Sequence, residues 1–191
     1  MTGKGAKATR RHVPIALIIE QGPHEGITRA EILRRTRAMI RLLQLDKAEV
    51  SFVLTDDKRL HELNKIYRGK DRPTDVLAFA MHEGEFGALA GHLLGDVIVS
   101  VPTARNQARS RRIPVLEEVT MLLAHGLLHL LGWDHETAAK DRLMRAETAR
   151  LCAAALPSTA KTVPSKEGAK RALTRKPSAT SPARRRKRPM T

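Results

Sequence analysis

Three histidines near residue 130 have the residue type and spacing of metal ligands. His125 and His129 are four residues apart, so on a helix they lie on one face and both rings can reach the same ion. Gly132 follows, and glycine readily adopts the left-handed conformation that ends helices, so the chain can turn back and direct His135 at that ion. Three neutral nitrogen ligands leave a fourth position for water, as in a catalytic zinc site.

Other interpretations of this segment are weaker. Two histidines four apart on an apolar helix can result from packing or chance. A third histidine beyond a helix-ending glycine is positioned by a separate structural feature, which favours the metal site. Gly126 stands where metalloproteases of the His-Glu-x-x-His type carry their general-base glutamate, so peptide hydrolysis by that mechanism is disfavoured. Cys152 is the only cysteine, which excludes an intrachain disulfide and a site of several thiolates.

The apolar pattern predicts the elements that must position these histidines. Short apolar runs indicate strands at 13–19, 49–54, 75–80 and 93–100, the last two forming a hairpin across a glycine-containing loop. Helices are expected at 28–43, from residue 55 or 56 to about 69, and at 102–111, 114–131 and 136–155. The prediction is an α+β (α/β-like) single domain, with a small mixed sheet of about four strands packed against several helices and a zinc site at a helix C-terminus.

The net charge of +15 is concentrated at the two ends of the chain. Residues 157–191 contain eleven Lys or Arg and one Glu, residues 1–12 contain four Lys or Arg, and residues 13–156 carry a net charge of only +1. The C-terminal segment has almost no large apolar residues after Leu156, so we expect it to be disordered. The apolar run at 13–19 is too short to span a bilayer, which predicts a soluble cytoplasmic protein with no membrane partner.

The segment His125–His135 resembles the signature of the YbeY family of bacterial endoribonucleases: two histidines four apart, then a glycine, an aromatic residue, an aspartate and a third histidine. The resemblance extends to Leu63–Leu77 and Leu94–Ser100. Two departures are visible. Ala78-Phe79-Ala80 stands where the family usually has Ser-Phe-Pro, and the loop at 111–114 differs from the usual one. Neither departure changes a histidine of the signature.

The resemblance implies a single-strand-specific, metal-dependent endoribonuclease. It implies action in ribosomal RNA processing, at the 3′ end of 16S ribosomal RNA, and in late ribosome quality control. Ribosomal RNA and the ribosome are the implied partners, with ribosomal or assembly-factor proteins as further candidates. The implied cofactor is one Zn²⁺ per chain, bound by His125, His129 and His135, and zinc can acidify water and polarise a phosphoryl oxygen.

Arg68 matches the functional arginine of the family and is the implied catalytic residue. Its planar guanidinium can hold a phosphate through two parallel hydrogen bonds. An ordinary surface ion pair is the alternative role for this side chain.

Taken together, these features divide the chain into a basic flexible N-terminus at 1–12, a zinc-dependent endoribonuclease domain at 13–156 and a disordered basic tail at 157–191. Two other classes of function stay open: a zinc hydrolase of a peptide, an amide or a small phosphoester, and a ribosome-assembly binding factor with a structural zinc. The nearly neutral domain does not by itself indicate RNA. The tail is interpreted either as a polyanion tether or as an extension without function.

Overall fold

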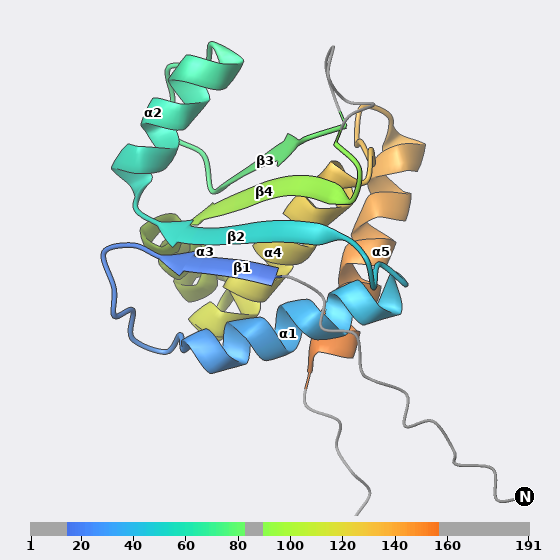
Figure 1. Ribbon diagram of the computed structural model, residues 1–191. Coiled ribbons are helices and arrows are strands. Elements are labelled where there is room, and N and C mark those ends of the chain that lie inside the picture. The colour runs from blue at the N-terminus through green and yellow to red at the C-terminus, as the bar shows by residue number, and fades with distance from the viewer. Residues whose placement is uncertain (1–14, 83–89, 157–191) are drawn as a thin grey trace, which may run out of the picture. The chain divides into compact units, whose positions relative to one another are not determined.

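The computed structural model describes residues 15–82 and 90–156, and both basic ends lie outside these ranges. The described residues form four strands and five helices in the expected order (Figure 1). The elements are β1 (Ile15–Ile19), α1 (Arg29–Leu42), β2 (Glu49–Thr55), α2 (Asp57–Arg68), β3 (Val76–Ala80), β4 (Leu93–Ser100), α3 (Val101–Arg111), α4 (Val115–Leu130) and α5 (Ala138–Ala155). The predicted α+β fold with a small mixed sheet is therefore confirmed.

All five helices begin within two residues of the expected position, and two of these starts have a clear cause in a capping side chain. Helix α5 begins two residues later than expected, because the Thr137 side chain accepts a hydrogen bond from the Lys140 amide and caps the helix there. Helix α3 begins directly after β4, with Ser100 as its capping residue. In the described ranges no single helix is long and apolar enough to cross a bilayer, and only α3 and α4 together, bent by 116°, have sufficient length and composition.

The four strands form one sheet in the order β1-β2-β4-β3. The first three are parallel, and β3 pairs antiparallel with β4, as the predicted hairpin required. Gly95 lies in this pairing with a φ of 132°, and a Cβ atom there would come within 1.9 Å of the Phe79 carbonyl oxygen. Only glycine fits at this position, which keeps β3 and β4 in register.

The side chains of the sheet alternate between two apolar layers. Val97 and Val99 of β4 face the main core, which also contains buried residues of α1, α3, α4 and α5. Ile98 faces the opposite side, where Leu60 and Leu63 of α2 pack on Leu77 of β3. In Figure 1, α4 and α5 lie behind the sheet and α2 lies at its upper left end. The ends of α2 and α4 are thereby brought to β3 from its two sides.

Helix α4 approaches the sheet closely at Gly126. A Cβ atom on this residue would lie 2.4 Å from Cγ1 of Val97 and 3.3 Å from Cγ2 of Val76. Val97 is fully buried, so it cannot move aside without disturbing the core. This close approach explains why the glutamate of the metalloprotease motif is absent here, because no side chain fits at position 126.

Gly126→Ala is expected to lower the free energy of unfolding by about 1–2 kcal/mol, measured by urea denaturation. Overpacking a core typically costs about 1–3 kcal/mol, and the better helix propensity of alanine returns at most about 1 kcal/mol. The control is the same substitution in a Val97→Ala background, where the obstructing methyl groups are absent and the loss should shrink. An equal loss in both backgrounds would show that the contact with Val97 is not the cause.

Candidate metal centre

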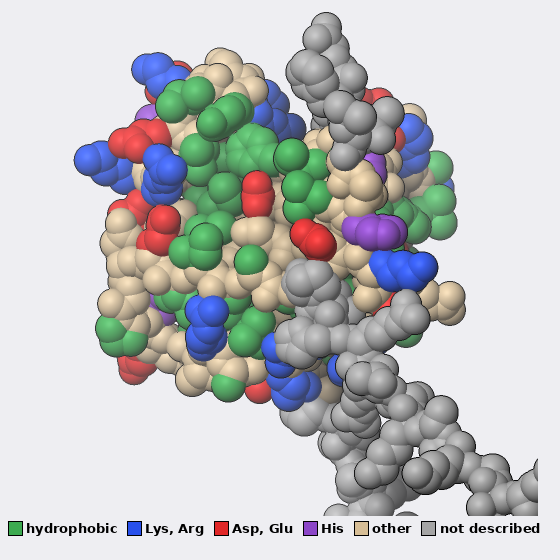
Figure 2. All heavy atoms as spheres, in the orientation of Figure 1, with side chains coloured by type: hydrophobic (Ala, Val, Ile, Leu, Met, Phe, Trp, Pro, Cys, Tyr) green, Lys and Arg blue, Asp and Glu red, His purple; other side chains and the backbone are tan. Residues whose placement is uncertain are grey.

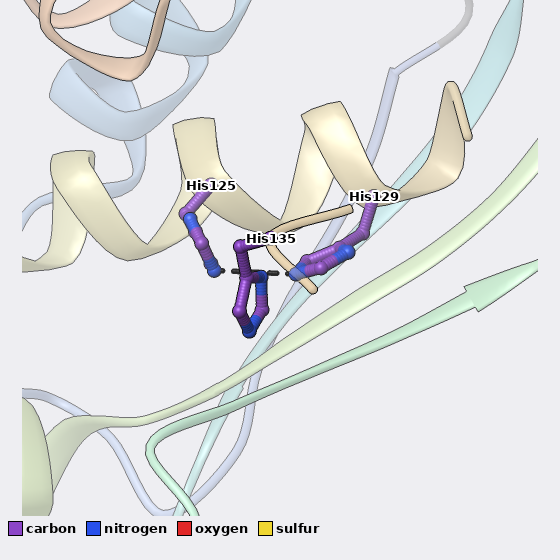
Figure 3. A group of neighbouring side chains, drawn as sticks. All are labelled: His125, His129 and His135. Carbon is purple, nitrogen blue, oxygen red and sulfur yellow. Dashed lines mark hydrogen bonds between the residues drawn. The ribbon is translucent and has the colours of Figure 1, made fainter. Parts of the chain in front are cut away.

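The three histidines of the signature converge at the C-terminal end of α4. Figure 3 shows His125 and His129 on successive turns of the helix and His135 beyond its end, with the rings directed at one another. Nε2 of His125 lies 3.2 Å from Nε2 of His129, and one ring nitrogen of each histidine lies within 4.8 Å of the other two. Tetrahedral zinc with bonds of 2.0–2.1 Å places ligand nitrogens about 3.3 Å apart. The donor set therefore fits a single metal ion.

A left-handed glycine brings His135 to the other two histidines. Gly132 has a φ of +79°, its amide donates to the His129 carbonyl at 2.9 Å, and the Trp133 amide donates to the Leu128 carbonyl at 3.1 Å. The turn predicted at Gly132 is confirmed. Asp134 stabilises the following turn, because its carboxylate accepts hydrogen bonds from the Glu136 amide at 3.2 Å and from Lys140 Nζ at 2.6 Å.

The environment of His125 favours the neutral imidazole that a metal ligand must be. Burial, reinforced by the neighbouring His129 and His135, lowers the pKa of His125 to about 4, while Asp75 acts in the opposite direction. This lowered pKa makes the uncharged form of His125 the dominant one at neutral pH. His135, in contrast, is exposed at the mouth of the site.

Arg68 lines the same cavity as the three histidines, although it lies 57 positions before His125 along the chain. The cavity has a volume of about 740 Å³. Gly69 ends α2 with a φ of +64°, and the Lys70 amide then donates to the Asn64 carbonyl at 3.1 Å. The Asn64 side chain is buried and donates to the Arg72 carbonyl at 2.8 Å, which secures the loop after Arg68.

The Arg68 side chain is exposed, and within residues 15–82 and 90–156 it forms no ion pair. Its neighbour on the same helix turn, Lys65, pairs with Asp71 at 2.7 Å. Arg68 thus has no ion-pair partner in the described part of the chain, which disfavours its alternative role in an ordinary surface ion pair. Its guanidinium is available to an anion in the cavity.

Sequence reasoning did not assign several residues of this cavity. Thr74, Asp75, Trp133 and Glu136 line it. Ala78 and Ala80 also line it, so one of the two departures from the family pattern faces the site.

The other departure from the family pattern, the loop at 111–114, has a structural role. Arg111 pairs with Glu118 at 2.7 Å, and burial, which outweighs the arginine, raises the pKa of that fully buried carboxyl.

Fold and site together define an α+β protein with a three-histidine candidate metal centre beside an arginine. The family model described as Endoribonuclease YbeY matches residues 22–155. The chain belongs to the YbeY family, as the motifs in its sequence indicated.

Two relatives and one solved structure illustrate the similarity. The protein named Endoribonuclease YbeY from Syntrophus aciditrophicus is 41% identical over 106 residues, 56% of this chain and 66% of that protein. The protein of the same name from Sulfurihydrogenibium sp. is 46% identical over 125 residues, 65% of this chain and 81% of that one. A solution structure of a Thermotoga maritima protein matches 74% of this chain and 88% of its own with a TM-score of 0.52. At 24% identity, that likeness concerns the fold alone.

Proposed function

We propose that this chain is a zinc-dependent endoribonuclease that cuts single-stranded RNA during ribosomal RNA processing, including maturation of the 16S 3′ end, and in late ribosome quality control. The observation that carries the proposal is the cavity shared by Arg68 and the three convergent histidines. Membership of a family whose model is described as an endoribonuclease supports the choice of substrate. Ribosomal RNA and the ribosome are then the partners, and the cytoplasm is the compartment.

His125, His129 and His135 would hold one zinc ion in this proposal. A bound zinc supplies Lewis-acid polarisation of a phosphoryl oxygen and makes water more acidic, which are the two requirements of phosphodiester cleavage. The protein contributes a neutral His125, whose pKa is about 4 because it is buried beside two other histidines. It also contributes the turn at Gly132, which directs His135 at the other two rings.

Arg68 would hold the scissile phosphate. Its planar guanidinium offers paired donors that match phosphate oxygens, and Lys70 adds a second positive charge to the wall of the same cavity. A peptidase of the His-Glu-x-x-His type is not supported, because α4 has no room for a glutamate at Gly126. The geometry therefore favours a phosphodiester over a peptide.

The proposal is tested by incubating the zinc-loaded protein with a labelled single-stranded RNA, the same RNA annealed to its complement, and the corresponding single-stranded DNA. Cleavage of the unpaired RNA is expected, with much slower cleavage of the duplex and the DNA. Equal cleavage of duplex and single strand would contradict the proposed specificity. Absence of cleavage in a protein with one zinc per chain would favour a binding factor with a structural metal.

We further propose that the basic tail, residues 157–191, tethers the enzyme to ribosomal RNA. Its eleven cations are separated from a nearly neutral domain. Deleting these residues should leave zinc content intact and weaken RNA binding, because each lost phosphate contact removes the release of a counterion. The slope of log affinity against log salt should become shallower by roughly 0.7 to 0.9 per contact removed. Identical affinities and slopes for the full-length and shortened chains would show that the tail does not contact RNA.

A further inference from the structure

Asp75 lies at the junction of the elements that form the cavity. It precedes β3, and its carbonyl accepts a hydrogen bond from the amide of Ser100, the last residue of β4, at 2.9 Å. Its side chain is partly buried and lines the same cavity as Arg68 and the histidines.

Donors from two elements hold the Asp75 carboxylate in one orientation. Oδ1 accepts from the Val76 amide at 2.9 Å and, at a longer 3.5 Å, from the Thr74 hydroxyl. Oδ2 accepts from Nε2 of Gln107 on α3 at 2.9 Å. Two carboxylate oxygens offer about four acceptor positions, so at least one lone pair stays open. The carboxylate is therefore oriented by the protein and still able to accept a proton.

Gln107 holds Asp75 at a cost to its own hydrogen bonding. Within the described ranges, Gln107 Oε1 is the only buried side-chain nitrogen or oxygen atom without a hydrogen-bond partner. An ionised carboxylate only accepts hydrogen bonds, so the amide must turn its Nε2 toward Asp75, which leaves Oε1 in this unpaired position. Unpaired buried polar atoms destabilise a fold and are rare in native proteins. An arrangement that accepts this cost to fix one carboxylate points to a functional role for that carboxylate.

The other carboxylates of the cavity are less suited to take a proton from a substrate or water. Asp134 is already bound to Lys140 and to the Glu136 amide. Glu136 is exposed at the rim of the cavity. Helix α4 cannot supply a base from Gly126, because a side chain there would collide with Val97. Asp75 is the carboxylate of the cavity that is both oriented and shielded.

We propose that Asp75 is the general base of the cleavage reaction and that Gln107 is its positioning residue. Asp75 takes a proton from the attacking water as that oxygen forms its bond to phosphorus. The bond from phosphorus to the leaving ribose oxygen breaks, the electron pair moves to that oxygen, and solvent protonates it. Asp75 then returns its proton to solvent. This inference rests on the proposed ribonuclease function and assigns the base that the function requires.

Asp75→Asn is the direct test, measured with zinc-loaded protein on a single-stranded RNA. The turnover number kcat should fall about 100- to 10,000-fold, as for loss of a general base, with KM and zinc content unchanged. The fold should be retained, because the Gln107 amide can rotate and present Oε1 to the new amide group. Asp46→Asn is the matched control, since it makes the same chemical change at an exposed aspartate that does not line the cavity, and its kcat should stay at the wild-type value.

Gln107→Met distinguishes a role of Gln107 in positioning Asp75 from a purely structural role. This substitution removes the donor to Asp75 together with the unpaired Oε1, so kcat should fall while KM and the melting temperature stay close to wild type. A residue with a purely structural role would show a lower melting temperature and an unchanged kcat. If Asp75→Asn does not fold, this variant still tests the role of Asp75, because an unchanged kcat in Gln107→Met would then overturn the proposal.

The outcomes distinguish this inference from the function on which it rests. Wild-type kcat in a folded Asp75→Asn protein, or an equal loss of kcat in Asp46→Asn, would overturn the role of Asp75 and leave the ribonuclease intact. If the zinc-loaded wild-type protein did not cut single-stranded RNA, the proposed function would fail, and the assignment of a base would fail with it.

Discussion

Replacing His129 with alanine is expected to reduce the bound zinc from about one ion per chain to a small fraction and to abolish RNA cleavage. His129 Nε2 lies 3.2 Å from His125 Nε2, so its removal takes away one of the two nitrogens already at the spacing of a shared ion. Two remaining imidazoles do not complete a catalytic site. A metal that binds only the folded state stabilises it, so loss of the proposed zinc should also lower the melting temperature. Atomic absorption after dialysis measures the metal, and gel electrophoresis of labelled RNA measures cleavage.

The matched control for this experiment is His61→Ala. His61 lies on α2 and contacts Asp71 at 2.7 Å, and it does not line the cavity. The control should keep its zinc and its cleavage rate. His135→Ala should behave like His129→Ala, because the turn at Gly132 directs this third ring at the other two. Full zinc retention in His135→Ala would show that the third ligand is a different residue.

Arg68→Ala is expected to reduce the rate of RNA cleavage about 100- to 1,000-fold, the range found when a preorganised donor to a developing charge is removed. Zinc content and the melting temperature should not change. Arg68 is exposed at the end of α2, and Gly69, not Arg68, provides the conformation that ends the helix. Single-turnover cleavage combined with metal analysis gives both quantities for the same preparation.

Two further variants test whether the charge of Arg68 or its planar pair of hydrogen-bond donors is required. Arg68→Lys keeps a positive charge but loses the planar pair of donors, so its rate should lie between those of wild type and Arg68→Ala. Lys65→Ala removes a cation from the same last turn of α2, where Lys65 pairs with Asp71, and should leave the rate unchanged. A wild-type rate in Arg68→Ala would show that the family role does not apply to this position.

Figure 2 places these assignments on the surface of the molecule. Hydrophobic side chains gather over the middle of the face that carries α2, with acidic side chains among them, and Lys and Arg side chains lie mainly around its margin. Ile66 and Tyr67 contribute to the exposed apolar surface of α2, with 71% and 66% of their surface accessible. The described domain therefore has no broad cationic stripe on this face. Recognition of RNA by the domain would then depend on local cations such as Arg68 and on the basic tail.

Local patterns in the sequence were sufficient to predict the elements and the geometry of the histidine turn. Short apolar runs and helical spacing act over a few residues, so all four strands and five helices could be expected. Gly132 was recognised as a helix end because left-handed conformations favour glycine, and the helix expected to end at about residue 69 does end at Gly69; both glycines have positive φ. The antiparallel β3–β4 hairpin followed from the glycine-containing loop between two neighbouring apolar runs.

Relations between distant segments could not be predicted from those patterns. The order β1-β2-β4-β3 depends on which strands pair, and apolar runs do not encode that choice. The hydrogen bond from Gln107 to Asp75 joins residues 32 positions apart, and neither residue stands out in the sequence. The obstruction at Gly126 likewise depends on Val97, a residue of another element. Only the packed structure brings these pairs together.

The proposed function requires zinc, held by the three histidines, for cutting single-stranded RNA. The most direct measurement removes the metal with a chelator, returns zinc in known amounts to the full-length protein, and follows cleavage of a labelled single-stranded RNA at each step. We expect no cleavage without zinc, a linear increase with added zinc and a plateau at one zinc ion per chain. Cleavage by the zinc-free protein at the rate of the zinc-loaded protein would show that zinc is not required.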